Sequence, residues 1–133
     1  MIKFRAWDKE NGIYLYNVQD AYDTLSGLVK YDDGEDAEYD EWCFGAFLNN
    51  KRYDVEQFTG LTDVNGKEIY EGDIIKSNYK YAQPKVSQII IEDGNSYILG
   101  EDLATGNEML VSDHVNEIEI IGNVHANPEL LKG

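Results

Sequence analysis

The sequence predicts a mainly β protein, an antiparallel meander that curls into a small SH3-like barrel. Short runs of alternating apolar and polar residues recur along the chain, turn residues separate them about every ten residues, and no long stretch has a helical period. With 42% apolar residues and two prolines among 133 residues, the chain can bury a core. This length predicts one domain over residues 1–133, with an N-terminal part at 1–52 and a β-barrel part at 53–133.

The N-terminus predicts a β-hairpin. In IKFRAW, Ile2, Phe4 and Ala6 alternate with Lys3, Arg5 and Trp7, which is typical of a half-buried strand. The stretch from Asp8 to Gly12 indicates a turn, and Ile13 to Val18 is rich in β formers that can return as the second strand.

The β pattern weakens between Gln19 and Asn50. One face of a short helix would hold Ala21, Leu25, Leu28 and Val29. From Asp32 to Glu41 the chain carries seven acids and offers only Ala37 and Tyr39 for burial. We therefore expect an acidic excursion that is solvated and dispensable for folding.

From Tyr53 onward the β signal persists. Tyr53 to Phe58 alternates, Asn65-Gly66 supplies the positive φ angles of a tight hairpin turn, and Gly72-Asp73 is a second turn that leads into Ile74-Ile75. Two further strands are expected at Val86 to Glu92 and Tyr97 to Leu103, followed by a turn at 104–107.

The C-terminal region predicts one more strand and two short helical segments. Ser112 is a candidate cap for one helical turn through Val115, and Glu117 to Val124 alternates like a strand. A short terminal helix should begin with Asn127 as N-cap and Pro128 as its first residue. The alternation in the first and last strands further predicts that Ile2, Phe4, Ile118 and Ile120 share one core or its adjoining parts.

The charge excludes several classes of partner. Eleven Lys and Arg against 26 Asp and Glu give −15, and the most biased stretch, residues 20–41, holds nine acids against Lys30. Such a surface repels phosphate and anionic lipid, which argues against nucleic-acid and membrane partners and leaves a basic protein as a candidate. The longest apolar run, Ile89 to Ile91, is too short to span a bilayer, and a single cysteine suits a reducing compartment, so we expect a cytoplasmic protein.

The inventory of reactive groups predicts no catalytic, cofactor-binding or metal-binding residue, and hence no enzyme. The acidic neighbours of Cys43 disfavour a thiolate, which leaves a buried structural cysteine, and His114 and His125 belong to no nucleophile motif. Their ordinary interpretation as surface or capping residues is favoured over a transition-metal site.

The spacing of acids and glycines also fails to match a calcium loop or a phosphate loop. A calcium loop needs an acid five residues before its glycine, and the positions before Gly34, Gly66 and Gly94 hold Val, Leu and Ile. The phosphate-loop pattern fails because residue 61 is Leu and residue 68 is Glu. A loose metal site remains an alternative to a solvated loop, among Asp32, Asp33, Asp36 and Asp40.

Aromatic residues are abundant, with ten tyrosines, four phenylalanines and two tryptophans. Tyrosine can bury its ring while its hydroxyl stays hydrated, which suits both the edge of a core and a protein interface. Ordinary β propensity explains the same abundance and is the favoured interpretation.

Three ordered segments resemble the YopX family of phage and prophage proteins. They are IKFRAWD near the start, FTGLTDVNGKEIYEGDII from Phe58 to Ile75, and IGNVHANPELL near the end. The resemblance implies a mainly β fold with an SH3-like barrel in the C-terminal part, a phage or prophage origin in a bacterial host cytoplasm, and homo-oligomers. It implies no assigned catalytic residue or cofactor, and the stretch from Gln19 to Arg52 carries no motif of the family.

Together these observations predict a non-enzymatic protein-interaction or assembly module with protein partners, one of which can be a basic host or phage protein. The alternative is an acidic DNA mimic or an inhibitor of a host DNA-binding protein. If extended at roughly 3.3 Å per residue, the stretch from Asp32 to Glu41 spreads its seven charges to one per about 4.7 Å. Duplex DNA carries one per about 1.7 Å, so a single copy is too dilute to mimic it.

Overall fold

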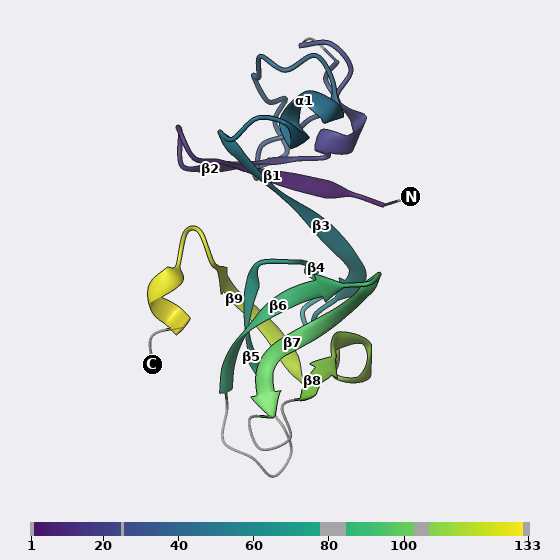
Figure 1. The fold of residues 1–133 in the computed structure, drawn as a ribbon, viewed down its shortest axis with the longest axis vertical. Coiled ribbons are helices and arrows are strands. Elements are labelled where there is room, and N and C mark those ends of the chain that lie inside the picture. The colour runs from purple at the N-terminus through teal and green to yellow at the C-terminus, as the bar shows by residue number, and fades with distance from the viewer. Residues whose placement is uncertain (1, 25, 78–84, 103–106, 132–133) are drawn as a thin grey trace. The chain divides into compact units, whose positions relative to one another are not determined.

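The computed structural model describes residues 2–24, 26–77, 85–102 and 107–131 and divides the chain into two compact units. Unit 1 comprises Met1–Gln57 and unit 2 comprises Phe58–Gly133. The protein is mainly β, with a four-stranded sheet of order β2-β1-β3-β4 and a five-stranded sheet of order β8-β7-β6-β5-β9, both antiparallel (Figure 1). The predicted fold class is therefore confirmed at the level of a mainly β, antiparallel protein.

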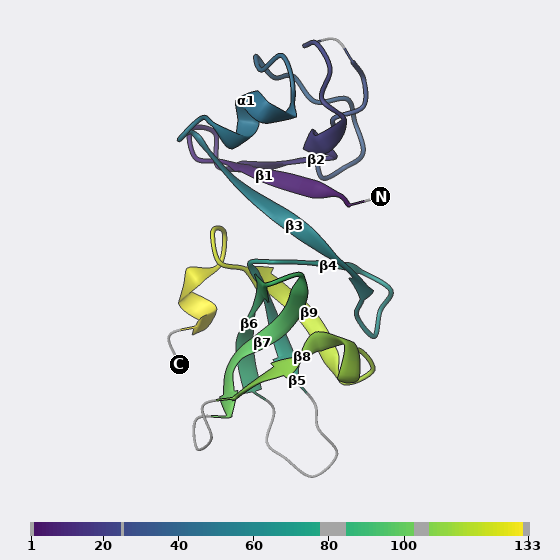
Figure 2. The same cartoon turned by 45° about the vertical axis from the view of Figure 1, so that its right-hand side comes forward.

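Unit 1 begins with the predicted hairpin. Strands β1 (Phe4–Asp8) and β2 (Ile13–Tyr16) pair antiparallel, and the first part of β3 (Tyr53–Thr62) pairs with the other edge of β1. Between β2 and β3 lie the 3₁₀ helix η1 (Val18–Asp20) and the short helix α1 (Phe44–Leu48), which lies over one face of these strands (Figure 2). Sequence patterning missed α1 because five residues are too few to show a helical period.

Three aromatic rings pack together in the core of unit 1. Phe47 of α1 is fully buried, and its ring centroid lies 5.7 Å from that of Tyr39 and 4.8 Å from that of Tyr53. The other buried members of this cluster are small or aliphatic: Ala6, Leu15, Val18, Ala21 and Val29. The core of unit 1 therefore contains side chains from α1 and from the strands β1, β2 and β3, which are far apart in the sequence.

The predicted faces of β1 are only partly correct. Ala6 is buried as expected, but Ile2, which precedes the strand, is 58% exposed, whereas Arg5 is only 4% exposed. A charged residue that pairs inside the fold can occupy a core position, and an alternating pattern does not reveal this (see below).

The acidic stretch is solvated as expected, with six exposed acids, but Glu41 is buried, and the dispensability of the stretch for folding stays a prediction. No helix forms over residues 21–24 and 26–29; Leu28 is exposed, and Leu25 lies outside the described residues. The backbone instead folds back on itself, because Lys30 exchanges two hydrogen bonds with Tyr16, and the Ala37 amide donates to the Val29 carbonyl. Within the acidic stretch Tyr39 enters the core, as the sequence allows, and Val29 just before the stretch does so too.

Unit 2 holds the curled sheet. The second part of β3 pairs with β4 (Glu68–Tyr70), and the five-stranded sheet forms a curled half-barrel (Figure 1). Its strands are β5 (Asp73–Ser77), β6 (Lys85–Glu92), β7 (Asn95–Asp102), β8 (Asn107–Leu110) and β9 (Ile118–Asn123). The predicted strands at 86–92 and 117–124 are confirmed to within a residue or two. The SH3-like barrel stays a prediction.

The two-residue hairpin turn of unit 2 lies at Asp93-Gly94 and not at Asn65-Gly66, where the sequence predicts it. The β6–β7 hairpin has a two-residue loop in which both Asp93 (φ 51°) and Gly94 (φ 83°) are left-handed, as a type I′ turn requires. Asn65-Gly66 instead lies in a longer loop between β3 and β4, where Gly66 (φ 79°) alone has a positive φ. The predicted turn at Gly72 is present, also at positive φ.

The helical ends differ in detail from the prediction. The 3₁₀ helix η2 (Val111–Asp113) starts before Ser112 and has Leu110 as its N-cap without a side-chain hydrogen bond. A 3₁₀ helix, η3 (Pro128–Leu131), follows Asn127, whose side chain accepts from the Asn123 amide at 3.3 Å. The predicted turn residues 104–106 and the predicted strand end Leu103 lie outside the described residues.

Unit 2 has its own core, which is aliphatic. Its buried cluster consists of Ile69, Ile75, Ile89, Ile98, Val111 and Ile118. The expectation that Ile2, Phe4, Ile118 and Ile120 share one core is therefore wrong: Phe4 packs against the unit 1 cluster, and Ile118 and Ile120 belong to that of unit 2. Among the described residues, no helix has the length and apolar character needed to cross a membrane.

Candidate functional site

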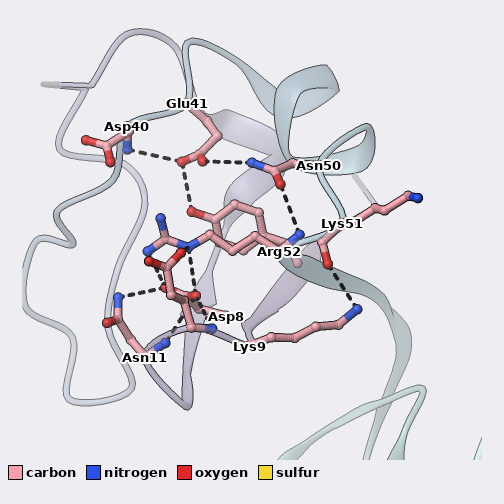
Figure 3. Close-up of polar contacts among 10 residues, drawn as sticks. Asp8, Lys9, Asn11, Asp40, Glu41, Asn50, Lys51 and Arg52 are labelled. Carbon is pink, nitrogen blue, oxygen red and sulfur yellow. Dashed lines mark hydrogen bonds and ion pairs between the residues drawn. The ribbon is translucent and has the colours of Figure 1, made fainter.

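A buried ion pair joins the end of β1 to the residue before β3. Asp8 is 2% exposed, and both of its carboxylate oxygens accept hydrogen bonds from the Arg52 guanidinium, Nε to Oδ1 and Nη2 to Oδ2, each at 2.9 Å (Figure 3). The same carboxylate accepts from the Glu10 amide at 3.0 Å and from the Asn11 side-chain amide at 2.9 Å. Arg52 also reaches the exposed carboxylate of Glu10 at 3.2 Å.

This geometry shifts both ionisations toward the charged forms. The hydrogen bonds from Arg52 hold the pKa of Asp8 below its ordinary value, against the opposing effect of burial. The same hydrogen bonds raise the pKa of Arg52. Because the pair is bidentate and one side chain is buried, it fixes the backbone that leads from α1 into β3.

Glu41 anchors the C-terminal end of the acidic stretch. Its buried carboxylate accepts from the Tyr53 hydroxyl at 2.9 Å, the Asp40 amide at 3.1 Å and the Asn50 side-chain amide at 3.5 Å (Figure 3). Burial, and then the hydrogen bond to Glu41, raise the pKa of Tyr53. The last acid of the stretch is thus a structural residue and is not part of the solvated surface.

A second polar cluster joins β1, β2 and β3. Glu56 Oε1 accepts from Arg5 Nε at 2.8 Å and from the Tyr14 hydroxyl at 2.9 Å, and the guanidinium lies 4.1 Å from the centre of the Tyr14 ring. Burial raises the pKa of Tyr16 to about 12, and the charges of Arg5 and Asp32 act on the same hydroxyl in opposite directions. Lys30 forms an ion pair with Asp36. Asp36 is therefore connected to β2 through Lys30, whose backbone bonds to that of Tyr16.

These anchors hold a strongly acidic surface in place. Six of the seven acids between residues 32 and 41 are exposed: Asp32, Asp33, Glu35, Asp36, Glu38 and Asp40. Unit 1 as a whole has 13 acids against 6 bases, a charge of −7. Chemically, such a surface can attract and bind cations, and it repels anions.

The predicted reactive residues do not converge. Cys43 is exposed, which corrects the expectation of a buried cysteine. Nδ1 of His114 lies 3.1 Å from a Glu117 carboxylate oxygen, and the His125 amide bonds to the Asn123 side chain. Across the part of the chain that the structure describes, no three His, Cys, Asp or Glu residues are grouped so that they could hold a metal ion.

Sequence reasoning missed the polar anchors. An Arg on the predicted outer face of one strand and a Glu on another gave no sign that Arg5 and Glu56 pair inside the fold. For Glu41, the only signal is that it directly precedes the aromatic run around α1, and its place at the end of the acidic run hides this.

Comparison with known proteins identifies the family. The family model described as YopX protein matches residues 3–132. The chain belongs to the YopX family. Two similar solved structures are the crystal structures of protein EF1440 from Enterococcus faecalis, at 28% identity and a TM-score of 0.63, and of protein yopX from Bacillus subtilis, at 23% identity and a TM-score of 0.60. A search of curated proteins found no match.

The structural matches cover nearly the whole chain. Each covers 98% of this chain, together with 98% of the Enterococcus faecalis protein and 96% of the Bacillus subtilis protein. The acidic stretch therefore lies within the YopX-like part of the chain, although it carries none of the sequence motifs that predicted the family. The structural matches therefore include the acidic stretch of unit 1.

Proposed function

We propose that this YopX-family protein is a non-enzymatic protein-interaction module that binds a basic protein through the acidic surface of unit 1. The observation that supports this most directly is that the 32–41 segment is held in place at its ends while most of its acids are exposed. The 32–41 segment is held near one end by Lys30, which bonds to Tyr16 and pairs with Asp36, and at the other end by the buried Glu41, while six of its carboxylates are exposed. Ordering like charges side by side has an electrostatic cost, which a basic partner would offset.

The finer expectations of the sequence stay proposals. A phage or prophage origin, action in a bacterial cytoplasm, an SH3-like barrel in unit 2 and homo-oligomers all follow from the family resemblance. We infer that an oligomer would leave the acidic surface free, because two copies of that surface would repel each other.

Site-specific photocrosslinking in bacteria tests the proposal. A photoreactive amino acid at Glu35 should capture a discrete basic protein, whereas the same group at Asp113, an exposed acid of unit 2, should not. Capture of nucleic acid only, or equal capture at both positions, would contradict the proposal.

The second candidate function is mimicry of DNA, which the exposed carboxylate row favours. It predicts that the captured protein is a DNA-binding protein and that duplex DNA competes with unit 1 for it. If DNA does not compete, the interaction or assembly function stands and mimicry is wrong.

A further inference from the structure

Two large aromatic side chains of unit 1 are strongly exposed. Trp42 is 70% exposed and Tyr22 is 79% exposed. Tryptophan is a residue whose burial contributes much to stability, and exposed aromatic side chains are enriched where proteins bind partners. Both therefore need an explanation other than packing in the core.

The two residues come from neighbouring backbone segments. The Asp23 amide donates to the Trp42 carbonyl at 2.7 Å, and Tyr22 and Cys43 form an antiparallel bridge. Within the described part of the chain, neither ring stacks on another ring or hydrogen-bonds through its side chain, whereas Tyr39, Phe47 and Tyr53 pack together in the core. The structure thus separates buried rings from two rings that face solvent.

The charges around these rings are negative. Asp23 lies across the backbone from Trp42, and Asp40 lies two residues before it; both are exposed, and the Asp23 carboxylate accepts only a 3.4 Å hydrogen bond from Thr24 among the contacts described. The one base among residues 20–41, Lys30, is paired with Asp36. An aromatic face beside carboxylates is a favourable environment for a guanidinium or ammonium group.

We propose that Trp42, together with Asp23 and Asp40, forms the docking surface for an arginine-bearing segment of another protein. This inference rests on the proposed function and names the chemistry of its partner. Arginine fits best because its planar cation can stack on an indole and hydrogen-bond a carboxylate at the same time. A second copy of this chain does not fit, because unit 1 carries −7 and would meet its own acids.

Titration calorimetry with a peptide of alternating Arg and Gly tests the inference. The matched probe replaces each Arg with citrulline, which keeps the shape and removes the charge. The wild-type chain should bind the Arg peptide and not the citrulline peptide, and Trp42→Ala should weaken binding about fivefold, with Trp42→Phe in between. Because Trp42 is exposed, its variants should keep the wild-type melting temperature. Binding by Trp42→Ala within twofold of wild type, or no binding of the Arg peptide, would overturn the inference.

Charge variants separate this inference from the proposed function. Asp23→Asn with Asp40→Asn removes two charges beside Trp42, and Glu92→Gln with Asp113→Asn removes two exposed charges of unit 2 as a control. If the first pair weakens binding and Trp42→Ala does not, the aromatic docking surface is wrong and the acidic interaction surface stands. If both charge pairs weaken binding equally, net charge alone attracts the peptide, and both proposals fail.

Discussion

The two units of this protein are stabilised in different ways. Unit 2 has an aliphatic core of isoleucine and valine under an antiparallel sheet. Unit 1 has a core that mixes aliphatic side chains with three aromatic rings, and it has four buried charged residues: Arg5, Asp8, Glu41 and Glu56. In the described part of unit 2, the buried carboxylate of Asp63 accepts from the backbone amides of Asn65, Lys67 and Ile120. In unit 1, each of these buried charged side chains bonds to another side chain.

The difference follows from the length of irregular chain that each unit must order. Unit 1 fixes the long connection between β2 and β3, which contains little regular structure, so side-chain hydrogen bonds replace the missing backbone ladder. Such a connection can present a charged surface in a defined conformation. In the described part of unit 2, the paired strands supply this ladder of backbone hydrogen bonds.

The largest expected effect comes from the ring at the centre of unit 1. Phe47→Ala should lower the free energy of unfolding by about 3–5 kcal/mol, because a fully buried ring is lost between Tyr39 and Tyr53. Both tryptophans, Trp7 and Trp42, lie in unit 1, so tryptophan fluorescence during denaturation reports on this unit. The neighbouring Leu48→Ala, at an exposed site, should change it by no more than about 0.5 kcal/mol. Equal losses in the two variants would contradict the assigned core.

The second-largest effect is expected at the ion pair between Asp8 and Arg52. Asp8→Asn should destabilise unit 1 by about 2–4 kcal/mol, since it replaces a buried bidentate partner of Arg52, whereas Glu10→Gln removes an exposed partner and should have little effect. Chemical denaturation followed by tryptophan fluorescence measures both. A larger loss in Glu10→Gln would reverse the order of the two contacts.

The pH dependence of the same pair has a definite sign. The pKa of Asp8 is lower in the folded chain than in the unfolded one, so its contribution is present above the unfolded value near 4 and is lost as the pH falls through the folded value. The stability difference between wild type and Asp8→Asn should therefore shrink below about pH 4. A difference that stays constant down to pH 2 would show that the charge of Asp8 does not matter.

At alkaline pH the prediction concerns Tyr16. Its pKa is raised to about 12 by burial, so its contribution is present below the unfolded value near 10 and is lost as the pH rises toward 12. Tyr16→Phe should therefore lose less stability than wild type between pH 10 and pH 12. Difference absorbance of the phenolate should show one fewer late-titrating tyrosine in this variant, and identical alkaline curves would exclude a buried Tyr16 hydroxyl.

In unit 2 the expected effect is smaller and resides in the backbone. Gly66→Val places a β-branched residue at positive φ and should cost about 1–3 kcal/mol, while Asn65→Ala, at an exposed position with ordinary φ, should cost less. Thermal melts followed by circular dichroism compare the two. Equal costs would favour the two-residue turn that the sequence predicts over the longer loop in the structure.

Unit 2 could be predicted from its sequence much better than unit 1. Alternation and turn residues located β6, β7 and β9, because in an antiparallel sheet local pattern and tertiary pairing agree. The same rules failed between Gln19 and Arg52, where burial of Tyr39 and Glu41 depends on partners such as Phe47 and Tyr53. Hydrogen bonds between side chains that are far apart in the sequence produce no periodic pattern. The polar anchors could therefore be identified only from the structure.

The central claim is that the connection between β2 and β3, which includes the acidic stretch, is an ordered part of unit 1, and amide hydrogen exchange tests it most directly. The amides of Asp23, Lys30 and Ala37 donate to the backbone carbonyls of Trp42, Tyr16 and Val29, so they should exchange slowly. In Tyr53→Phe, which loses the hydroxyl bonded to Glu41, exchange should quicken at Asp23 and Ala37 before it does at the β1 amides. Protection of these three amides in the wild type is the predicted result, and exchange at the rate of an unstructured chain would contradict it.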